Sequence, residues 1–190
     1  IRHITADHRF NPKLYPSEGE FRSVQRFKTE PFITISPASV WFTKQYPEEK
    51  WVSFLNSLKG VNTYILGSKS DRIIGDKIID SSSNEKIANL AGDLSLLQSA
   101  ALMKDARMNY ANDSAPMHLA SAVNAPVTAI YCSTTPDFGF GPLSEDSFVV
   151  QTAQNLDCRP CGLHGKSKCP KKHFQCAMTI EDEQLLNSLA

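Results

Sequence analysis

Short apolar runs alternate along this chain with longer segments whose apolar residues recur at helical spacing, and this alternation predicts strands separated by helices. The expected strands are Phe32–Ser36, Thr63–Leu66, Ile87–Leu90, Arg107–Tyr110 and Val127–Cys132. The expected helices are Ser17–Phe27, Pro47–Lys59, a helix that follows Asp71 and ends near Ile79, Ser95–Lys104, Pro116–Val123 and Glu181–Leu189. This order is typical of βαβ units, so we expect an α/β fold with a parallel sheet.

Composition narrows the class of protein. The chain has 190 residues, 41% of them hydrophobic, which is enough for one α/β core with appendages. Basic and acidic residues number 20 each, so no net charge draws the chain to nucleic acid or to an anionic membrane. No apolar run approaches the roughly 20 residues of a membrane span, and we expect no secretory signal. The opening at Ile1 without Met suggests a piece of a longer protein.

Polar segments follow each of the expected strands. In an open α/β sheet, ligands bind beyond the carboxyl ends of the strands, where such segments converge. The segments are Ser36–Lys44, Gly67–Asp71, Ala91–Leu94, Asn112–His118 and Ser133–Phe140. We expect them to surround a common site.

The segment Asn112–His118 combines a strand end, a tight polar turn and a helix start. Asp113 and Ser114 are favoured N-cap residues, and Pro116 suits a first helical turn. Free N–H groups and the positive end of a helix dipole at such a junction suit a phosphate. The junction therefore predicts an anionic, nucleotide-like ligand.

Single residues in these segments admit two interpretations each. Lys44 lies in an unusually apolar loop and could bind a diphosphate and stabilise a leaving group, or it could be an ordinary surface lysine. Gly67 and Asp71 could contact a ligand, or could end a strand and cap a helix. His118 could contact a ligand, or could be a buried histidine bonded to a backbone group.

Four motifs in order carry a resemblance to a known family. They are Ser36-Pro-Ala-Ser-Val-Trp-Phe-Thr-Lys-Gln-Tyr-Pro-Glu-Glu49, Ile65-Leu-Gly67, Asn89-Leu-Ala-Gly92 and Asn112-Asp-Ser-Ala-Pro-Met-His-Leu-Ala120. Over roughly residues 31–179 the chain resembles the heptosyltransferases (glycosyltransferase family 9), which add heptose to the inner core of bacterial lipopolysaccharide. The resemblance implies the C-terminal, donor-binding half of a GT-B glycosyltransferase, with a Rossmann-like parallel sheet and helices on both faces.

The resemblance also implies roles for individual residues. Lys44 corresponds to a lysine that contacts the donor phosphates, and Asp71 lies near an acidic position that holds the ribose. One departure is Ala115, where the family usually has glycine; a positive φ there would strain alanine, and a methyl group could crowd the phosphate. The implied donor-binding residues are Ser39, Thr43, Lys44, Gly67, Asp71, Asp113, Ser114, Ala115 and His118.

The same resemblance implies a division of labour between two domains. Residues 1–30 would be a linker or arm, 31–152 the nucleotide-sugar-binding domain, and 153–190 a Cys-rich segment with a C-terminal helix. The donor would by default be ADP-heptose and the acceptor a lipopolysaccharide core. The aspartate general base would belong to an N-terminal domain absent from this chain, so we expect donor binding without turnover. Transfer would be inverting, would require no metal or cofactor, and would be cytoplasmic.

The cysteines form a second pattern. Cys158, Cys161, Cys169 and Cys176 could close a structural tetrahedral zinc site; free thiols and disulfides are the alternatives. Cys132 suits a buried apolar position. Basic residues nearby could meet an acceptor's phosphates or the inner membrane surface, or could belong to a solvated loop. They are Arg159, Lys166, Lys168, Lys171 and Lys172.

Two other functions compete with the glycosyltransferase interpretation. One is a stand-alone sugar-nucleotide-binding or epimerase-like module of related fold, which needs no second domain. The other is a zinc ribbon for nucleic acid, against which the zero net charge argues. We therefore expect no nucleic-acid partner.

Overall fold

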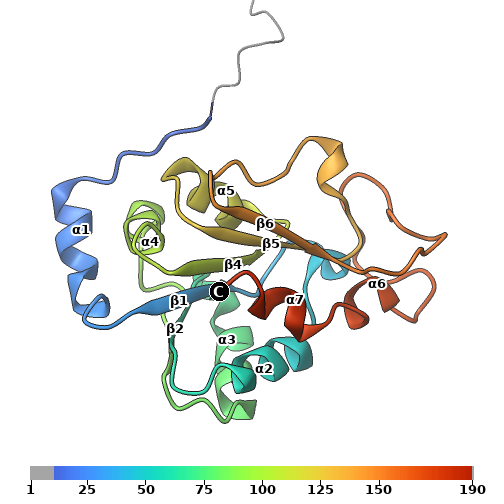
Figure 1. The fold of residues 1–190 in the computed structure, drawn as a ribbon, viewed down its shortest axis with the longest axis horizontal. Coiled ribbons are helices and arrows are strands. Elements are labelled where there is room, and N and C mark those ends of the chain that lie inside the picture. The colour runs from blue at the N-terminus through green and yellow to red at the C-terminus, as the bar shows by residue number, and fades with distance from the viewer. Residues whose placement is uncertain (1–10, 190) are drawn as a thin grey trace, which may run out of the picture.

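The computed structural model describes residues 11–189, in which six parallel strands form one sheet in the order β3-β2-β1-β4-β5-β6 (Figure 1). The strands are β1 Phe32–Ser36, β2 Asn62–Ile65, β3 Ile87–Asn89, β4 Met108–Asn112, β5 Val127–Tyr131 and β6 Ser147–Gln151. The five expected strands are confirmed, with ends that differ by up to two residues. The edge strand β6 was not predicted from the sequence, because its three apolar residues, Phe148, Val149 and Val150, are consecutive and do not alternate with polar ones. In the structure Phe148 and Val149 are exposed and only Val150 is buried.

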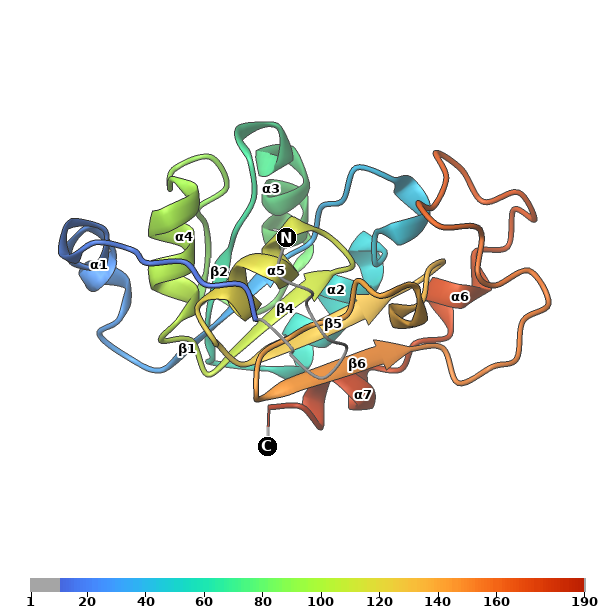
Figure 2. The same cartoon turned by 90° about the horizontal axis from the view of Figure 1, so that it is seen from above.

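Helices connect the strands and cover both faces of the sheet (Figure 2). The helices are α1 Glu18–Val24, α2 Glu48–Ser57, α3 Arg72–Ser81, α4 Leu96–Met103, α5 Ala115–Ala122, α6 Gln175–Met178 and α7 Asp182–Leu186. Ser17 with Glu20 and Ser95 with Gln98 form capping boxes, which fix the starts of α1 and α4. The C-terminal helix is shorter than expected and packs against α2.

Alternate residues of each strand enter two separate cores, as the two-residue period of a strand requires. Ile33 and Ile35 face the core beneath α2, α3 and α7, whereas Phe32 faces the core shared with α1, α4 and α5. Both cores are built from buried side chains, so the sheet presents no open face in its centre. This burial explains the continuous apolar character of the middle strands.

The N-terminal arm expected over residues 1–30 lies partly outside the described residues. From residue 11 onward the chain runs along the fold, and the Leu14 N–H donates to the Ala122 carbonyl at 2.8 Å. Helix α1 packs against α4, and its residue Val24 is fully buried. Within residues 11–189, no helix is both long enough and apolar enough to cross a bilayer.

The order of the sheet creates a switch point between β1 and β4. From β1 the chain passes outward to β2 and β3, then returns to β4 on the other side of β1 and continues to β5 and β6. The loops that follow β1 and β4 therefore diverge and leave a crevice at the carboxyl edge of the sheet. This is where the sequence places its most polar segments.

Candidate functional site

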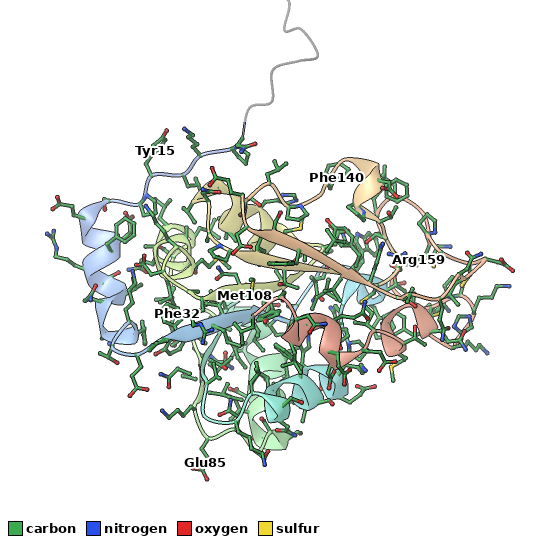
Figure 3. All side chains as sticks on the ribbon, in the orientation of Figure 1. Tyr15, Phe32, Glu85, Met108, Phe140 and Arg159 are labelled. Atoms are coloured by element: carbon green, nitrogen blue, oxygen red, sulfur yellow. The ribbon has the colours of Figure 1, made fainter. Side chains whose placement is uncertain are left out.

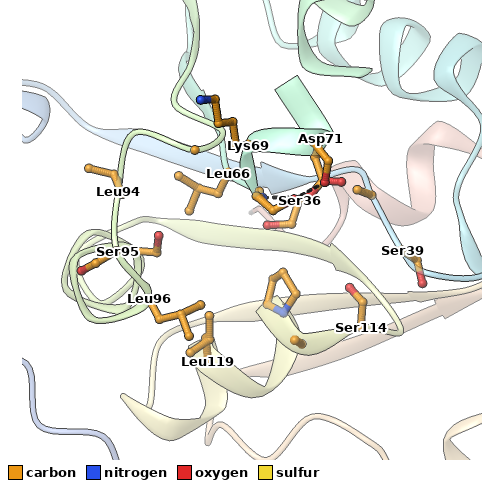
Figure 4. A pocket seen from close by; sticks show the side chains of 18 of the residues that line it. Ser36, Ser39, Leu66, Lys69, Asp71, Leu94, Ser95, Leu96, Ser114 and Leu119 are labelled. Atoms are coloured by element: carbon orange, nitrogen blue, oxygen red, sulfur yellow. Dashed lines mark hydrogen bonds between the residues drawn. The ribbon is translucent and has the colours of Figure 1, made fainter. Parts of the chain in front are cut away.

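A cavity of about 770 Å³ opens at this crevice (Figure 4). Its walls come from the loops that follow β1, β2 and β3, from one side of α4 and from the N-terminal part of α5. One wall is apolar and consists of Leu66, Leu94, Leu96, Met103 and Leu119. Several serines, together with Lys69 and Asp71, form the polar part. The combination suits a ligand with one flat apolar portion and one hydroxylated or charged portion.

Ser36 supplies an unsatisfied hydroxyl to the cavity. Its side chain is the last of β1, is only 1% exposed and lines the cavity (Figure 4). Within the described part of the chain its Oγ has no hydrogen-bond partner. A buried hydroxyl without a partner costs free energy, so a ligand that bonds to Ser36 would recover that cost.

Beside the cavity, Lys44 and Asp113 form a buried ion pair. The Lys44 Nζ lies 2.7 Å from the Asp113 Oδ2, which also accepts a hydrogen bond from the Thr134 hydroxyl at 2.7 Å. The side chains are only 16% and 9% exposed. Asp113 therefore holds the lysine in one place, while the ammonium group keeps further N–H donors for an anion.

The start of α5 directly follows Asp113. Ser114 is the N-cap residue, but its side chain makes no capping bond; its hydroxyl instead donates to the Asn112 carbonyl at 3.3 Å. The first N–H groups of α5 are thus left without a side-chain cap, and Ser114 and Ala115 both line the cavity. A positive helix end and a fixed lysine at one side of a cavity are features that suit the negative charge of a phosphate group.

Glycosyltransferase family 9 (heptosyltransferase) has a sequence profile that matches residues 8–172. The chain belongs to this family. The lipopolysaccharide heptosyltransferase 2 of Escherichia coli strain K12 is 30% identical over 150 residues, which are 74% of this chain and 43% of that protein. The lipooligosaccharide heptosyltransferase 2 of Haemophilus ducreyi is 31% identical over 132 residues, 65% of this chain and 38% of that protein.

Solved structures of family 9 agree with the fold. The E. coli ADP-heptose lipopolysaccharide heptosyltransferase II superposes with a TM-score of 0.74 at 26% identity, covering 94% of this chain and 52% of the other. A family 9 glycosyltransferase from Veillonella parvula gives 0.76 at 19% identity and 97% coverage, which shows the shared fold. The chain thus spans about half the length of the relatives that it matches.

Most of the residues that the family resemblance singles out gather at the cavity. Ser39, Gly67, Asp71, Ser114 and Ala115 line it. The pair Lys44–Asp113 lies immediately beside the Ser114 wall.

Three of the implied donor-binding residues, Thr43, Asp71 and His118, are not placed for a simple side-chain contact with a ligand in the cavity. Thr43 is 1% exposed, and its hydroxyl accepts hydrogen bonds from the Lys166 N–H at 2.7 Å and from the Ser133 hydroxyl at 2.9 Å. Asp71 lines the cavity, but its Oδ2 accepts from both the N–H and the hydroxyl of Ser68 at 2.7 Å. One carboxylate oxygen of Asp71 is thus occupied with shaping the turn. His118 is half-buried on α5 and is not part of the cavity wall.

Ala115 carries no backbone strain. Its φ is not positive, since the described non-glycine residues with positive φ are Asn124, Lys172 and Phe174. The alanine in place of the family's usual glycine is therefore compatible with the backbone of the turn. Its methyl group is exposed at the cavity wall, where it takes up space beside the helix start.

Asn112 is a structural residue of the site that we did not identify from the sequence. Its side chain is fully buried at the end of β4. The Oδ1 accepts from the Tyr46 N–H at 2.9 Å, and the Nδ2 donates to the Pro37 carbonyl at 2.7 Å. The amide thus holds both ends of the loop that carries Lys44. An asparagine inside an otherwise apolar strand end is the signal that could have revealed it.

The four cysteines of the Cys-rich segment surround a second cavity of about 370 Å³, together with His173. All are free thiols, and the Cys158 Sγ lies 3.8 Å from the His173 Nε2. Burial raises the pKa of Cys161 and raises the pKa of Cys176 to about 11, which keeps both thiols protonated at neutral pH. Within residues 11–189, no three His, Cys, Asp or Glu side chains stand close enough together to hold a metal ion.

Proposed function

We propose that the cavity binds a nucleoside diphosphate sugar and that this chain is the donor-binding part of a heptosyltransferase. The observation that carries the proposal is the fixed Lys44–Asp113 pair directly before the uncapped start of α5, whose first residues line one large cavity. The lysine and the helix end would bind the diphosphate, and the apolar wall would receive the base. The serine-rich part would receive the sugar and the ribose.

We further propose ADP-heptose as the donor and a lipopolysaccharide core as the acceptor. The support is the likeness to the E. coli ADP-heptose lipopolysaccharide heptosyltransferase II, together with the apolar wall of the cavity, which suits a base. In the transfer, Lys44 and the start of α5 would stabilise the charge that develops on the departing diphosphate. Inversion at the sugar would need a general base, which we assign to the half of the relatives that this chain does not span.

Calorimetric titration tests the donor site directly. ADP, UDP, GDP and ADP-heptose are titrated into the purified protein at the same ionic strength. We expect ADP and ADP-heptose to bind and the other two nucleotides to bind more weakly. Equal affinity for all three nucleoside diphosphates would contradict the assignment of the base. If none of the four compounds binds, either to this chain or to a longer form that includes an N-terminal domain, the proposed donor site is wrong.

We also propose that the Cys-rich segment can hold a structural metal ion, because its four thiols surround a single small cavity. Metal binding would draw these thiols together and release their protons.

We propose the cytoplasmic face of the inner membrane as the place of the reaction. The basic residues of the Cys-rich segment would there be oriented toward an anionic acceptor.

We expect about one zinc ion per chain after incubation with zinc and gel filtration, measured by elemental analysis. Cys161→Ala should lose the metal, because a tetrahedral site loses one of its four ligands. Cys132→Ala is the matched control, since Cys132 is a buried free thiol at the end of β5 outside this cavity. Equal zinc contents of the two variants would contradict the assignment of the ligands.

A further inference from the structure

The Cys-rich segment reaches back across the fold to the loop that carries Lys44. The Thr43 N–H donates to the Lys166 carbonyl at 3.0 Å, and the Lys166 N–H donates to the Thr43 Oγ1 at 2.7 Å. These two bonds join residues 123 positions apart in the sequence. In Figure 2 the short turn that precedes α2 lies beside the loop that leads toward α6, in agreement with these contacts.

Thr43 is also bonded to the end of β5. Its carbonyl accepts from the Ser133 N–H at 3.2 Å, and its hydroxyl accepts from the Ser133 hydroxyl at 2.9 Å. Every backbone polar group of Thr43 is therefore engaged, and the residue is almost fully buried. Because Lys44 follows immediately, the backbone from which its side chain extends is fixed from two sides.

Gly165 lies against the side chain of Lys44 itself. A Cβ added at Gly165 would come within 2.9 Å of the Lys44 Cγ and 3.2 Å of the Lys44 Cδ. No side chain fits in that space unless the lysine or the loop moves. The methylene stem of Lys44 is thus packed against the backbone of the Cys-rich segment while its Nζ is paired with Asp113.

Arg159 anchors the beginning of this segment to the sheet (labelled in Figure 3). Its guanidinium donates to the backbone carbonyls of Cys132 at 2.8 Å and Thr134 at 2.6 Å, and to the Gln151 Oε1 at 2.7 Å. The Cys161 N–H donates to the Ser133 carbonyl at 2.8 Å. The segment is therefore bonded to the ends of β5 and β6 before it reaches Lys44.

We propose that Gly165 and the backbone of Lys166 act as a positioning clasp for Lys44, which sets the place of the ammonium group and thereby the affinity for the donor diphosphate. The inference rests on the proposed donor site, but it concerns a different part of the chain. Neither Gly165 nor Lys166 lines the donor cavity; both act through Thr43 and Lys44. The segment thus gains a role at the donor site that is separate from metal binding.

Two glycines of the segment provide a matched test. Gly165 and Gly162 both have a positive φ, of 78° and 91°, so alanine strains the backbone at each. Only at Gly165 does the new Cβ meet Lys44; at Gly162 it meets nothing within 4 Å. We expect Gly165→Ala to weaken ADP binding by at least about tenfold in calorimetry, because small displacements of a charged contact are costly. Gly162→Ala should bind ADP like the original protein.

A second readout makes the clasp testable even without donor binding. The rate at which an acylating reagent modifies the Lys44 amine, followed by mass spectrometry, should rise in Gly165→Ala and stay unchanged in Gly162→Ala. Equal behaviour of the two variants in this assay would overturn the clasp. If Lys44→Met fails to weaken ADP binding, the donor site is wrong, yet the modification rates still decide whether the segment positions Lys44.

Substitutions at Thr43 test the clasp independently if the Gly165→Ala variant does not fold. Thr43→Val removes the hydroxyl that bonds to Lys166 and Ser133, whereas Thr43→Ser retains it. We expect faster modification of Lys44 and weaker ADP binding in the valine variant, with rescue in the serine variant. Loss of ADP affinity in both variants, or in neither, would contradict the clasp.

Discussion

Replacing Lys44 with methionine is expected to weaken ADP binding by about ten- to hundredfold, because a charged hydrogen bond to a phosphate contributes about 1.5–3 kcal/mol. Methionine keeps an unbranched stem of similar length, so the packing against Gly165 is largely retained while the charge is removed. Calorimetric titration at fixed ionic strength gives the affinity. Lys77→Met, on the exposed side of α3, is the control for a general loss of positive charge.

The variant should also lose about 1–3 kcal/mol in free energy of unfolding, because Asp113 is left buried without its cation. The double variant Lys44→Met with Asp113→Asn removes this unpaired charge. It should regain stability in denaturant titrations without regaining affinity for ADP. Recovery of ADP binding in the double variant would show that the single substitution acted through folding rather than through a phosphate contact.

Asn112→Ala is expected to lower the free energy of unfolding by about 2–5 kcal/mol, since it leaves the Tyr46 N–H and the Pro37 carbonyl without partners in the interior. The loop between these residues carries Lys44, so ADP binding should weaken as well. Denaturant titration measures the first effect, and calorimetry well below the unfolding transition measures the second.

Asn109→Ala separates the two effects. Asn109 is also fully buried in β4, and its amide bonds to Thr34, to the Met103 carbonyl and to the Pro126 carbonyl, none of which belongs to the Lys44 loop. This variant should lose similar stability and keep its affinity for ADP. If both variants bind ADP equally well, the Asn112 amide does not hold the site.

The strands and their order in the chain were predictable because buried parallel strands read as short apolar runs bounded by polar turns. The convergence of the polar loops followed from topology alone. The pairing of Lys44 with Asp113 did not, because it requires that β1 and β4 be neighbours, and local sequence patterns do not specify which strands pair. Strand β6 was missed because an edge strand is held by only one partner and needs less apolar surface.

Residue roles were predictable only where backbone geometry decided them. Ser114 and Ala115 line the cavity because a helix that begins directly after a strand has its first residues at the carboxyl edge of the sheet. Thr43 could not be distinguished from Ser39 by type, yet the contact with Lys166 turns the threonine away from the cavity. The sign of φ at Ala115 was likewise undecided in the sequence, and a methyl group at that position proved compatible with the turn.

Ser36 has a consequence for selectivity among compounds that fill this cavity. Its hydroxyl is buried in the cavity wall without a partner among the described residues. A compound that places a methyl or methylene group against it would leave that hydroxyl without a partner and would gain no affinity from it. A compound that offers an acceptor at that point would be favoured over an otherwise identical one, and sites built in this way discriminate far more strongly than apolar pockets do. An inhibitor series could therefore be optimised at a single atom.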